Sequence, residues 1–246
     1  GALASFWLYT TSQISPLLTV VLVAPISFIG NWLIYRFLLT PLVRRSKTQS
    51  HLEVDSILAT FGMSFILIGI MFSIEGGFFA YKYLSTAISI LGSTTSLSRF
   101  VAFLIAVLIG GLLYLWLNHT RSGVAVRAVS VSTEASGLVG INVPRVSALA
   151  FALGGAITAV GGALISTFIT LDASIGVVFT LKALIIVIMG GVGDIRGAIV
   201  AAIILGVVET AVATLIDPGL TLAAAYLIFL LILLFRPQGL FGRRAL

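Results

Sequence analysis

Residues 99–118 read RFVAFLIAVLIGGLLYLWLN and carry no charged side chain after Arg99. A helix of about twenty residues rises about 30 Å, which matches the thickness of the hydrocarbon core of a bilayer. This segment therefore predicts a helix that crosses a membrane. Similar apolar runs recur along the chain, and about seven spans are expected: 16–38, 54–73, 99–118, 147–169, 178–190, 197–216 and 221–235.

The composition of the whole chain supports the same fold class. Of the 246 residues, 59% are hydrophobic and 9% are charged, whereas soluble domains carry about 25% charged residues. We therefore expect an all-α, polytopic transmembrane helical bundle that forms a single domain over residues 1–246. The chain has no cysteine, which excludes disulfides and thiolate metal sites. His51 and His119 lie in polar loops far apart in sequence, so neither predicts a metal site.

The distribution of basic residues predicts the orientation of the chain. Eleven of the 14 Lys and Arg residues fall on one side of the predicted spans: Arg36, Arg44, Arg45, Lys47, Arg121, Arg127, Arg145, Arg196, Arg236, Arg243 and Arg244. Cytoplasmic loops of membrane proteins are enriched in Lys and Arg. This side is therefore predicted to be cytoplasmic and to hold the C-terminus. The net charge of +6 is then explained without nucleic acid.

Small residues form stripes along two of the predicted spans. Gly154, Thr158 and Gly162 recur every four residues in span 147–169, and Gly206 belongs to a similar stripe in span 197–216. Small residues let helices approach closely in lipid, where apolar side chains give little drive for association. These stripes are either packing seams between helices or the lining of a narrow pathway.

One acidic residue, Glu209, lies deep in span 197–216. Intramembrane acids are costly and usually face protein or water. Glu209 is therefore either a hydrogen-bonded link between helices or a polar element of a translocation pathway or gate. Lys182 is expected to extend outward to the membrane surface, and its different depth argues against an ion pair with Glu209.

The stretch 188–200, IMGGVGDIRGAIV, resembles a phosphate-binding loop only superficially. Its glycine spacing misses the dinucleotide fingerprint, and no Gly-Lys-Ser/Thr follows. Span 178–190 before it covers only about 20 Å, which is short for a crossing. We interpret the stretch as a helix break, in which Asp194 caps the next helix. The residues of this break are Gly190, Gly191, Gly193, Asp194 and Gly197.

The loop 119–146 is the most informative polar segment. Apolar residues at a spacing of three and four predict an amphipathic helix within 124–139, which Gly140 ends. Pro144, just before span 147–169, is expected to bar this helix from continuing into the span. Such a helix either lies on lipid headgroups or docks into a partner protein.

Three motifs of the chain resemble permease subunits of branched-chain amino acid ABC transporters. The first is TRSGVAVRAVSVSTEASGLVGINVPRVSALAFALGGAITAVGGAL at 120–164, the second is GGVGDIRGAIVAAIILGVVE at 190–209, and the third is RPQGLFG at 236–242. Within the first motif the matching positions are Thr120, Gly123, Arg127, Ala128, Glu134, Ala135, Gly140, Ile141, Arg145, Ala150 and Phe151. Ser136 is a mild departure from the family pattern. The three motifs occur in the family's order and spacing.

The resemblance implies that loop 119–146 carries a coupling helix for a cytoplasmic ATPase. The coupling residues would be Arg127, Glu134, Ala135, Gly140 and Arg145. ATP and magnesium would then be bound by separate ATPase subunits, and this chain would hold no cofactor. The other implied partners are a second permease subunit, identical or different, and an extracytoplasmic substrate-binding protein. The family also has helices before the region matching GALASFWLY, so the N-terminus is expected to be truncated.

The resemblance implies import of branched-chain amino acids, or of a related small solute such as an amide or urea, across a bacterial or archaeal inner membrane. Two other classes of function were weighed. A secondary transporter or channel driven by an ion gradient often carries paired ionisable residues and an inverted repeat, which the sequence does not display. An intramembrane enzyme needs a nucleophile with a base, or metal ligands, and the sequence has no such motif. The chain is therefore predicted to be a transport subunit.

Overall fold

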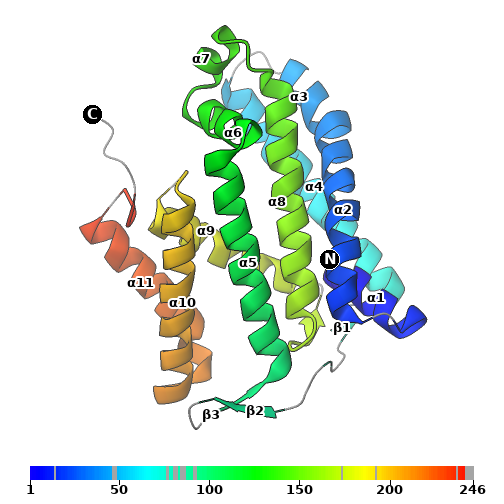
Figure 1. The fold of residues 1–246 in the computed structure, drawn as a ribbon, viewed down its shortest axis with the longest axis vertical. Coiled ribbons are helices and arrows are strands. Elements are labelled where there is room, and N and C mark those ends of the chain that lie inside the picture. Colours follow the sequence, from blue (N-terminus) through cyan, green and yellow to red (C-terminus); the bar gives the residue numbers. More distant parts are fainter. Residues whose placement is uncertain are drawn as a thin grey trace. The chain divides into compact units, whose positions relative to one another are not determined.

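The computed structural model describes residues 1–13, 15–45, 49–75, 78–79, 83, 87–90, 93–172, 174–191, 193–236 and 238–241 (Figure 1). Two compact units make up the chain, Gly1–Ala173 and Ser174–Leu246. Three of the eleven basic residues named in the charge argument lie outside the described residues: Lys47, Arg243 and Arg244.

The first unit is helical, with two short β-ladders. Its helices are α1 (Ala2–Ser12), α2 (Pro16–Ile34), the π-helix η1 (Tyr35–Leu39), α3 (Thr40–Arg45), α4 (Gln49–Glu75), α5 (Leu97–His119), α6 (Arg121–Val131), α7 (Thr133–Leu138) and α8 (Val143–Ile165). Strands β2 (Ala87–Ile90) and β3 (Ser93–Ser96) form an antiparallel hairpin. Strand β1 (Phe78–Phe79) pairs with β4 (Leu171–Asp172). Because β1 follows α4 and β4 follows α8, this pairing brings the C-terminal ends of these two helices to the same side.

The second unit is a helical hairpin with a third helix. Helix α9 (Ile175–Gly190) is followed by α10 (Ile195–Leu215), a 3₁₀ turn η2 (Pro218–Leu220) and α11 (Thr221–Phe235). Five buried side chains form its apolar core: Ile185, Met189, Ala201, Leu205 and Ala225. All three long helices contribute to this cluster, which therefore holds the unit together.

The membrane-spanning prediction is confirmed with adjusted boundaries. Within the described residues, six helices are long and apolar enough to cross a bilayer, and α9 is a shorter apolar helix. The six are Pro16–Val43, Val54–Ser73, Leu97–His119, Val143–Ile165, Ile195–Leu215 and Pro218–Phe235. The 16 residues of α9 extend the predicted span 178–190 at its start, but the helix stays short for a full crossing.

The helix of the loop does not continue through Pro144, as predicted, but the following span begins before residue 147. Helix α8 begins at Val143, and Pro144 lies in its first turn, where a missing N–H breaks no hydrogen bond. The Asn142 side chain caps the helix by accepting a hydrogen bond from the Arg145 N–H at 3.2 Å. The span therefore starts and ends four residues earlier than 147–169.

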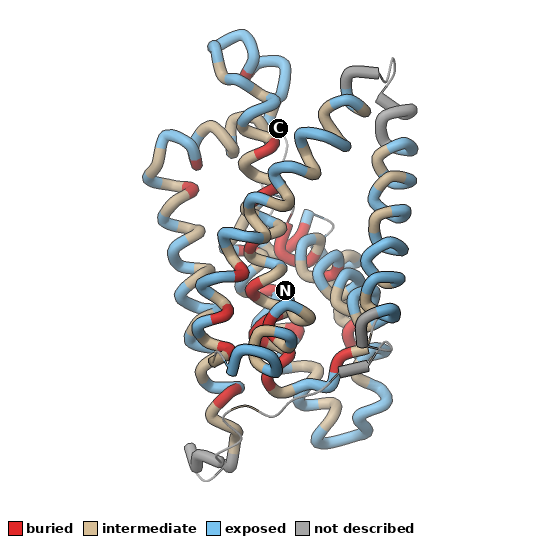
Figure 2. The backbone as a smooth tube through the Cα atoms, turned by 90° about the vertical axis from the view of Figure 1, so that its right-hand side faces the viewer, coloured by how far each residue is buried: buried red, intermediate tan, exposed pale blue. Residues whose placement is uncertain are grey.

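Helix α8 packs along α2 through small residues. Ala148, Ala152, Ala156 and Val160 recur every four residues on α8 and are all buried. The other side of the contact includes Asn31, whose side chain would overlap a Cβ atom added at Gly155. Figure 2 shows such buried positions as narrow bands on helices that are otherwise exposed. This exposure is the pattern that a lipid-facing surface produces.

Candidate functional site

The loop predicted to couple to an ATPase folds as two short helices. Helix α6 is capped by Thr120, whose hydroxyl oxygen accepts a hydrogen bond from the Gly123 N–H at 3.0 Å. Ser132 then takes an extended conformation and caps α7 through a hydrogen bond from the Ala135 N–H at 3.2 Å. One continuous helix over 124–139 was therefore wrong, because the Ser132 side chain competes for backbone donors and starts a new helix.

Gly140 ends α7 as the sequence predicted. Its φ of +82° is favourable for glycine. The Gly140 N–H donates to the Gly137 carbonyl at 3.2 Å, and the Ile141 N–H donates to the Ser136 carbonyl at 3.1 Å. This pair of bonds is a Schellman motif, which fixes the direction of the chain as it leaves α7. Buried Ser136 contributes its carbonyl to this turn.

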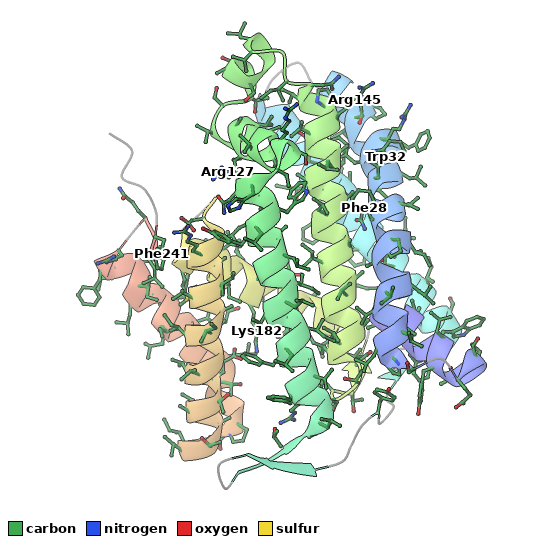
Figure 3. The ribbon with its side chains drawn as sticks, viewed as in Figure 1. Phe28, Trp32, Arg127, Arg145, Lys182 and Phe241 are labelled. Carbon is green, nitrogen blue, oxygen red and sulfur yellow. The ribbon has the colours of Figure 1, made fainter. Side chains whose placement is uncertain are left out.

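Helix α6 is fastened to the end of α5. A Cβ atom added to Gly123 would lie 2.3 Å from the Trp116 carbonyl oxygen, so only glycine permits this approach. The Arg127 guanidinium donates a hydrogen bond to the Asn118 side-chain oxygen at 2.8 Å. In Figure 3, Arg127 projects from α6 close to α5. The loop is thus rigidly attached to one membrane helix, and it runs through Gly140 directly into the next, α8.

The ends of α6 and α7 present apolar side chains that nothing in the described part of the chain covers. Val131, Leu138 and Val139 are 87%, 90% and 76% exposed. Glu134 in the first turn of α7 and the neighbouring Ala135 are also exposed. Isolated exposed apolar residues are common, but three together on a short polar loop indicate a contact surface. The acidic residue beside them adds charge to this surface.

The predicted pathway residues of α8 lie away from its packing seam. Gly154 and Thr158 are exposed, and the Thr158 hydroxyl donates to the Gly154 carbonyl at 2.9 Å. Gly162 is partly covered, because an added Cβ atom would lie 3.3 Å from the Ala2 nitrogen. The seam within the chain uses the alanines of α8 instead. The Gly154 stripe as a pathway wall, or as a seam with another subunit, stays a prediction.

Helix α10 repeats this arrangement. Gly206 and Thr210 are exposed, and the Thr210 hydroxyl donates to the Gly206 carbonyl at 2.8 Å. Because the hydroxyl is satisfied within its own helix, it presents a methyl group and a second acceptor site outward. Both stripes therefore offer a smooth surface with little unsatisfied polarity.

Lys182 and Glu209 form an ion pair, which contradicts the expectation that their depths would keep them apart. The Lys182 Nζ lies 2.8 Å from Glu209 Oε1 and donates to Oε2 at 2.8 Å. The predicted span began at 178, whereas α9 begins at Ile175, so Lys182 lies deeper in the helix than expected. The long, flexible lysine side chain spans the remaining difference in depth between the two residues. The two side chains are 24% and 20% exposed.

The glycine break joins α9 to α10 through a close backbone crossing. A Cβ atom added to Gly197 would lie 2.0 Å from the Gly190 carbonyl oxygen. Gly191 and Gly193 have φ values of +100° and +89°. The Asp194 carboxylate caps α10, accepting from the Arg196 N–H at 2.8 Å and the Gly197 N–H at 3.2 Å. The predicted helix break and its cap are therefore confirmed.

The C-terminal motif closes on this break, which the sequence did not predict. The Leu240 N–H donates to the Met189 carbonyl at 2.7 Å, and the Phe241 N–H donates to the Gly190 carbonyl at 3.2 Å. These bonds satisfy carbonyls at the end of α9 that no helical donor reaches. A signal was present in RPQGLFG, since a proline and two glycines after an apolar helix indicate a turn. The sequence did not indicate that this turn would contact the end of α9.

Substituting Gly239 with alanine is expected to release this C-terminal segment. Gly239 has a φ of +82°, and an added Cβ atom would lie 2.5 Å from the Gly191 nitrogen. We expect the amides of Leu240 and Phe241 to exchange with deuterium roughly tenfold faster or more, a loss of about 1.4 kcal/mol of local stability. Hydrogen–deuterium exchange with mass spectrometry measures this rate.

Gly193→Ala is the matched control. Gly193 also has a positive φ, but no atom lies within 4 Å of an added Cβ. It should strain the break without accelerating exchange at Leu240 and Phe241. Equal acceleration in both variants would show that backbone strain, and not the contact with Gly191, controls the segment.

No group of three or more His, Cys, Asp or Glu side chains suited to a metal ion occurs among the described residues. Three acidic side chains serve as helix caps or as the partner of Lys182, namely Asp194, Asp217 and Glu209. The features that the structure builds are thus a loop between two membrane helices, a fixed helix break and an intramembrane ion pair.

Comparison with known proteins agrees with these features. Residues 1–236 match the family described as "Branched-chain amino acid transport system / permease component". The chain is 29% identical to the high-affinity branched-chain amino acid transport system permease protein LivH of Salmonella typhimurium, over 99% of this chain and 82% of that protein. It is 31% identical to the permease protein BraD of Pseudomonas aeruginosa, over 62% of this chain and 50% of that protein.

No solved structure matches the chain at a significant level. The family membership accounts for the apolar spans and does not favour a transporter driven by an ion gradient. A permease component is a transport subunit and not an enzyme. The match extends over all the spanning helices and the loop of α6 and α7, so the chain belongs to the family of branched-chain amino acid transport system permease components, the membrane subunits of ABC importers.

Proposed function

We propose that this chain forms part of the membrane pathway of an ATP-driven importer for branched-chain amino acids or a related small solute, such as an amide or urea. The observation that carries the proposal is the α6–α7 loop, which is fastened to α5 and leads directly into α8. A rigid loop between two spanning helices transmits force to both. ATP and magnesium would be bound by cytoplasmic ATPase subunits.

The surface of α7 suits an ATPase groove. Leu138 of α7 and Val131 at the end of α6 are exposed beside Glu134 and Ala135, and an apolar contact with a charged rim is typical of protein interfaces. Arg127 and Arg145 lie in the helices on either side of α7. Movement of the ATPase against this surface would shift α5 and α8 together, and Gly140 sets the direction of the chain between α7 and α8.

The named relatives support the proposed substrate class, since both are permease proteins of high-affinity branched-chain amino acid transport systems. The exposed stripes with Gly154, Thr158 and Gly206 would suit a small neutral or zwitterionic solute, because they offer few charges. We propose two further partners. One is a second permease subunit, identical or different, and the other is an extracytoplasmic substrate-binding protein that supplies specificity.

The proposed location is the inner membrane of a bacterium or archaeon, with the C-terminus in the cytoplasm. The support is the excess of arginine at one end of the predicted spans. Loop 119–146 would face the cytoplasm together with the break between α9 and α10. This places the α7 surface on the same side as the ATPase.

Reconstitution tests the function directly. The permease would be co-purified with its ATPase subunits, inserted into liposomes and assayed for ATP hydrolysis with the binding protein and leucine or urea. The expected result is hydrolysis that one solute stimulates. Uptake that survives removal of ATP and follows a proton or sodium gradient would refute the proposal.

Substituting Glu134 with arginine tests the coupling loop. Reversing the charge of an interface residue places it against groups that had matched the acid, so we expect ATPase association to weaken roughly tenfold. Membrane insertion should not change, because Glu134 is exposed and contributes no packing. Affinity co-purification and substrate-stimulated ATP hydrolysis measure the effect.

The control is Thr133→Arg, which adds an arginine at the neighbouring exposed position but leaves the carboxylate in place. It should weaken association less than Glu134→Arg. Normal ATPase association and transport with Glu134→Arg would refute the assignment of α7 to the coupling contact. Absence of ATP-driven uptake with every combination of subunits tested would refute the proposed function itself.

A further inference from the structure

A cavity of about 390 Å³, lined by apolar side chains and two arginines, lies within the first unit, at one end of two spanning helices. It separates the end of the α2–η1–α3 segment from the first turns of α8. Eight residues line it: Trp32, Tyr35, Arg36, Thr40, Pro41, Pro144, Arg145 and Ala148. Figure 3 shows Trp32 and Arg145 at the same end of α2 and α8.

The charge lining this cavity is one-sided. Among the described residues that line it, Arg36 and Arg145 are the charged ones, and neither guanidinium has a carboxylate of the described residues within 4 Å. The Arg36 guanidinium lies 5.2 Å from the centre of the Trp32 ring, which holds it in place by a cation–π contact. Two guanidinium groups at one cavity without a counterion make an anion the matching ligand.

The position of Arg145 strengthens this argument. It lies in the first turn of α8, where the helix dipole is positive and a cation is disfavoured. An anion beside the first turn would be attracted by the dipole and by the guanidinium at once. The cavity therefore gathers three sources of positive potential.

The π-helix gives the cavity its second wall. In η1 the chain is widened by one residue per turn, and the Thr40 hydroxyl donates to the Tyr35 carbonyl at 2.9 Å. Both residues line the cavity. Such π-helical turns occur frequently at functional sites. The wall is thus formed by a local departure from regular helix.

The depth of the cavity identifies the kind of anion. Its residues belong to the last part of span Pro16–Val43 and the first turns of span Val143–Ile165, so it lies at a membrane boundary. Trp32 is typical of that boundary. On either side of Trp32 along α2, Ile29 and Leu33 are 57% and 40% exposed, which leaves an apolar surface toward the bilayer. A ligand with a phosphate in the cavity and acyl chains along α2 fits both surfaces.

We propose that this cavity binds the phosphate headgroup of an anionic phospholipid, with Arg36 and Arg145 as the phosphate ligands. A planar guanidinium group can donate two hydrogen bonds to two oxygens of one phosphate, whereas a lysine ammonium acts as a point charge. Basic pockets between membrane helices are suited to such headgroups. The bound lipid would join the α2–η1–α3 segment to α8, the helix that continues from the coupling loop.

Native mass spectrometry of the full-length permease tests this proposal. The protein in detergent would be titrated with phosphatidylglycerol, with phosphatidylcholine of the same chains, and with inorganic phosphate. We expect one phosphatidylglycerol to be retained in preference to phosphatidylcholine. Substituting Arg36→Gln or Arg145→Gln should weaken that retention roughly tenfold each.

Arg121→Gln is the matched control, because Arg121 is exposed at the start of α6 and does not line the cavity. It should leave the retention unchanged. If either glutamine variant fails to fold, Arg36→Lys with Arg145→Lys keeps both charges and should weaken retention without abolishing it. Equal retention of both lipids, equal loss in Arg121→Gln, or binding of inorganic phosphate as tight as that of phosphatidylglycerol would overturn the proposal. Displacement of the lipid by the ATPase would also overturn it and assign the cavity to protein docking.

Discussion

Substituting Glu209 with glutamine is expected to lower the free energy of unfolding of the Ser174–Leu246 unit by about 3 kcal/mol. The change leaves the Lys182 ammonium, which lies 2.8 Å from the carboxylate, without a counterion among apolar side chains. We take the low end of the usual range because both side chains are about one-fifth exposed. Denaturation of the permease in mixed micelles, followed by the circular dichroism of its helices, measures the loss of stability.

The double variant Lys182→Met with Glu209→Gln separates the loss of an interaction from the burial of a lone charge. Removing both charges at similar volume is expected to restore stability to within about 1 kcal/mol of the original. A double variant as unstable as Glu209→Gln alone would mean that the carboxylate has another essential partner. Both carboxylate oxygens lie 2.8 Å from Lys182 Nζ, so any further partner would share them with the lysine.

The same double variant decides between the two roles considered for Glu209. A link between helices can be replaced by neutral side chains, so substrate-stimulated ATP hydrolysis should survive. A polar element of the pathway cannot be replaced in this way, and stimulation should fall while the protein stays folded. The decision needs the stability measurement first, because an unfolded protein loses both properties.

Substituting Gly197 with alanine is expected to cost about 3 kcal/mol, the upper end for overpacking. The added methyl would lie 2.0 Å from the Gly190 carbonyl oxygen, and backbone on both sides leaves no flexible side chain to yield. The helices must separate, which also weakens the cluster around Met189 and Ala201. The mid-point of thermal denaturation measures the loss.

Gly206→Ala on the same helix is the control. No atom lies within 4 Å of an added Cβ at Gly206, and alanine favours helix over glycine by up to about 1 kcal/mol. This variant should be as stable as the original or slightly more so. If Gly197→Ala were as stable as Gly206→Ala, then α9 and α10 would not cross as closely as described.

The spanning helices could be predicted because their signal is local. An apolar run of sufficient length has no alternative to a helix in lipid, since every backbone group must be paired internally. Boundaries were less accurate where one side chain decides them. Asn142 starts α8 before Pro144, and Ser132 divides the coupling segment in two. Both residue types are common N-caps, but the sequence alone does not determine which of several possible capping residues begins the helix.

The candidate site was predicted in part. Gly140 and Asp194 behave as expected, because a positive φ and a helix cap depend on neighbouring residues only. The Lys182–Glu209 pair was missed, since it depends on how far α9 extends and how the helices cross. The cavity between Arg36 and Arg145 brings together residues from distant spans. No pattern in the sequence specifies such a pairing without the packing of α2 on α8.

The bonds from Leu240 and Phe241 to the end of α9 have a consequence for synthesis in the cell. The Met189 and Gly190 carbonyls emerge early, but their donors are made only after α10 and α11. Unpaired carbonyls are costly in lipid, so the end of α9 gains these two hydrogen bonds only after residues 240 and 241 have been synthesised. A chain that stops before Leu240 is therefore expected to leave the Met189 and Gly190 carbonyls without these donors.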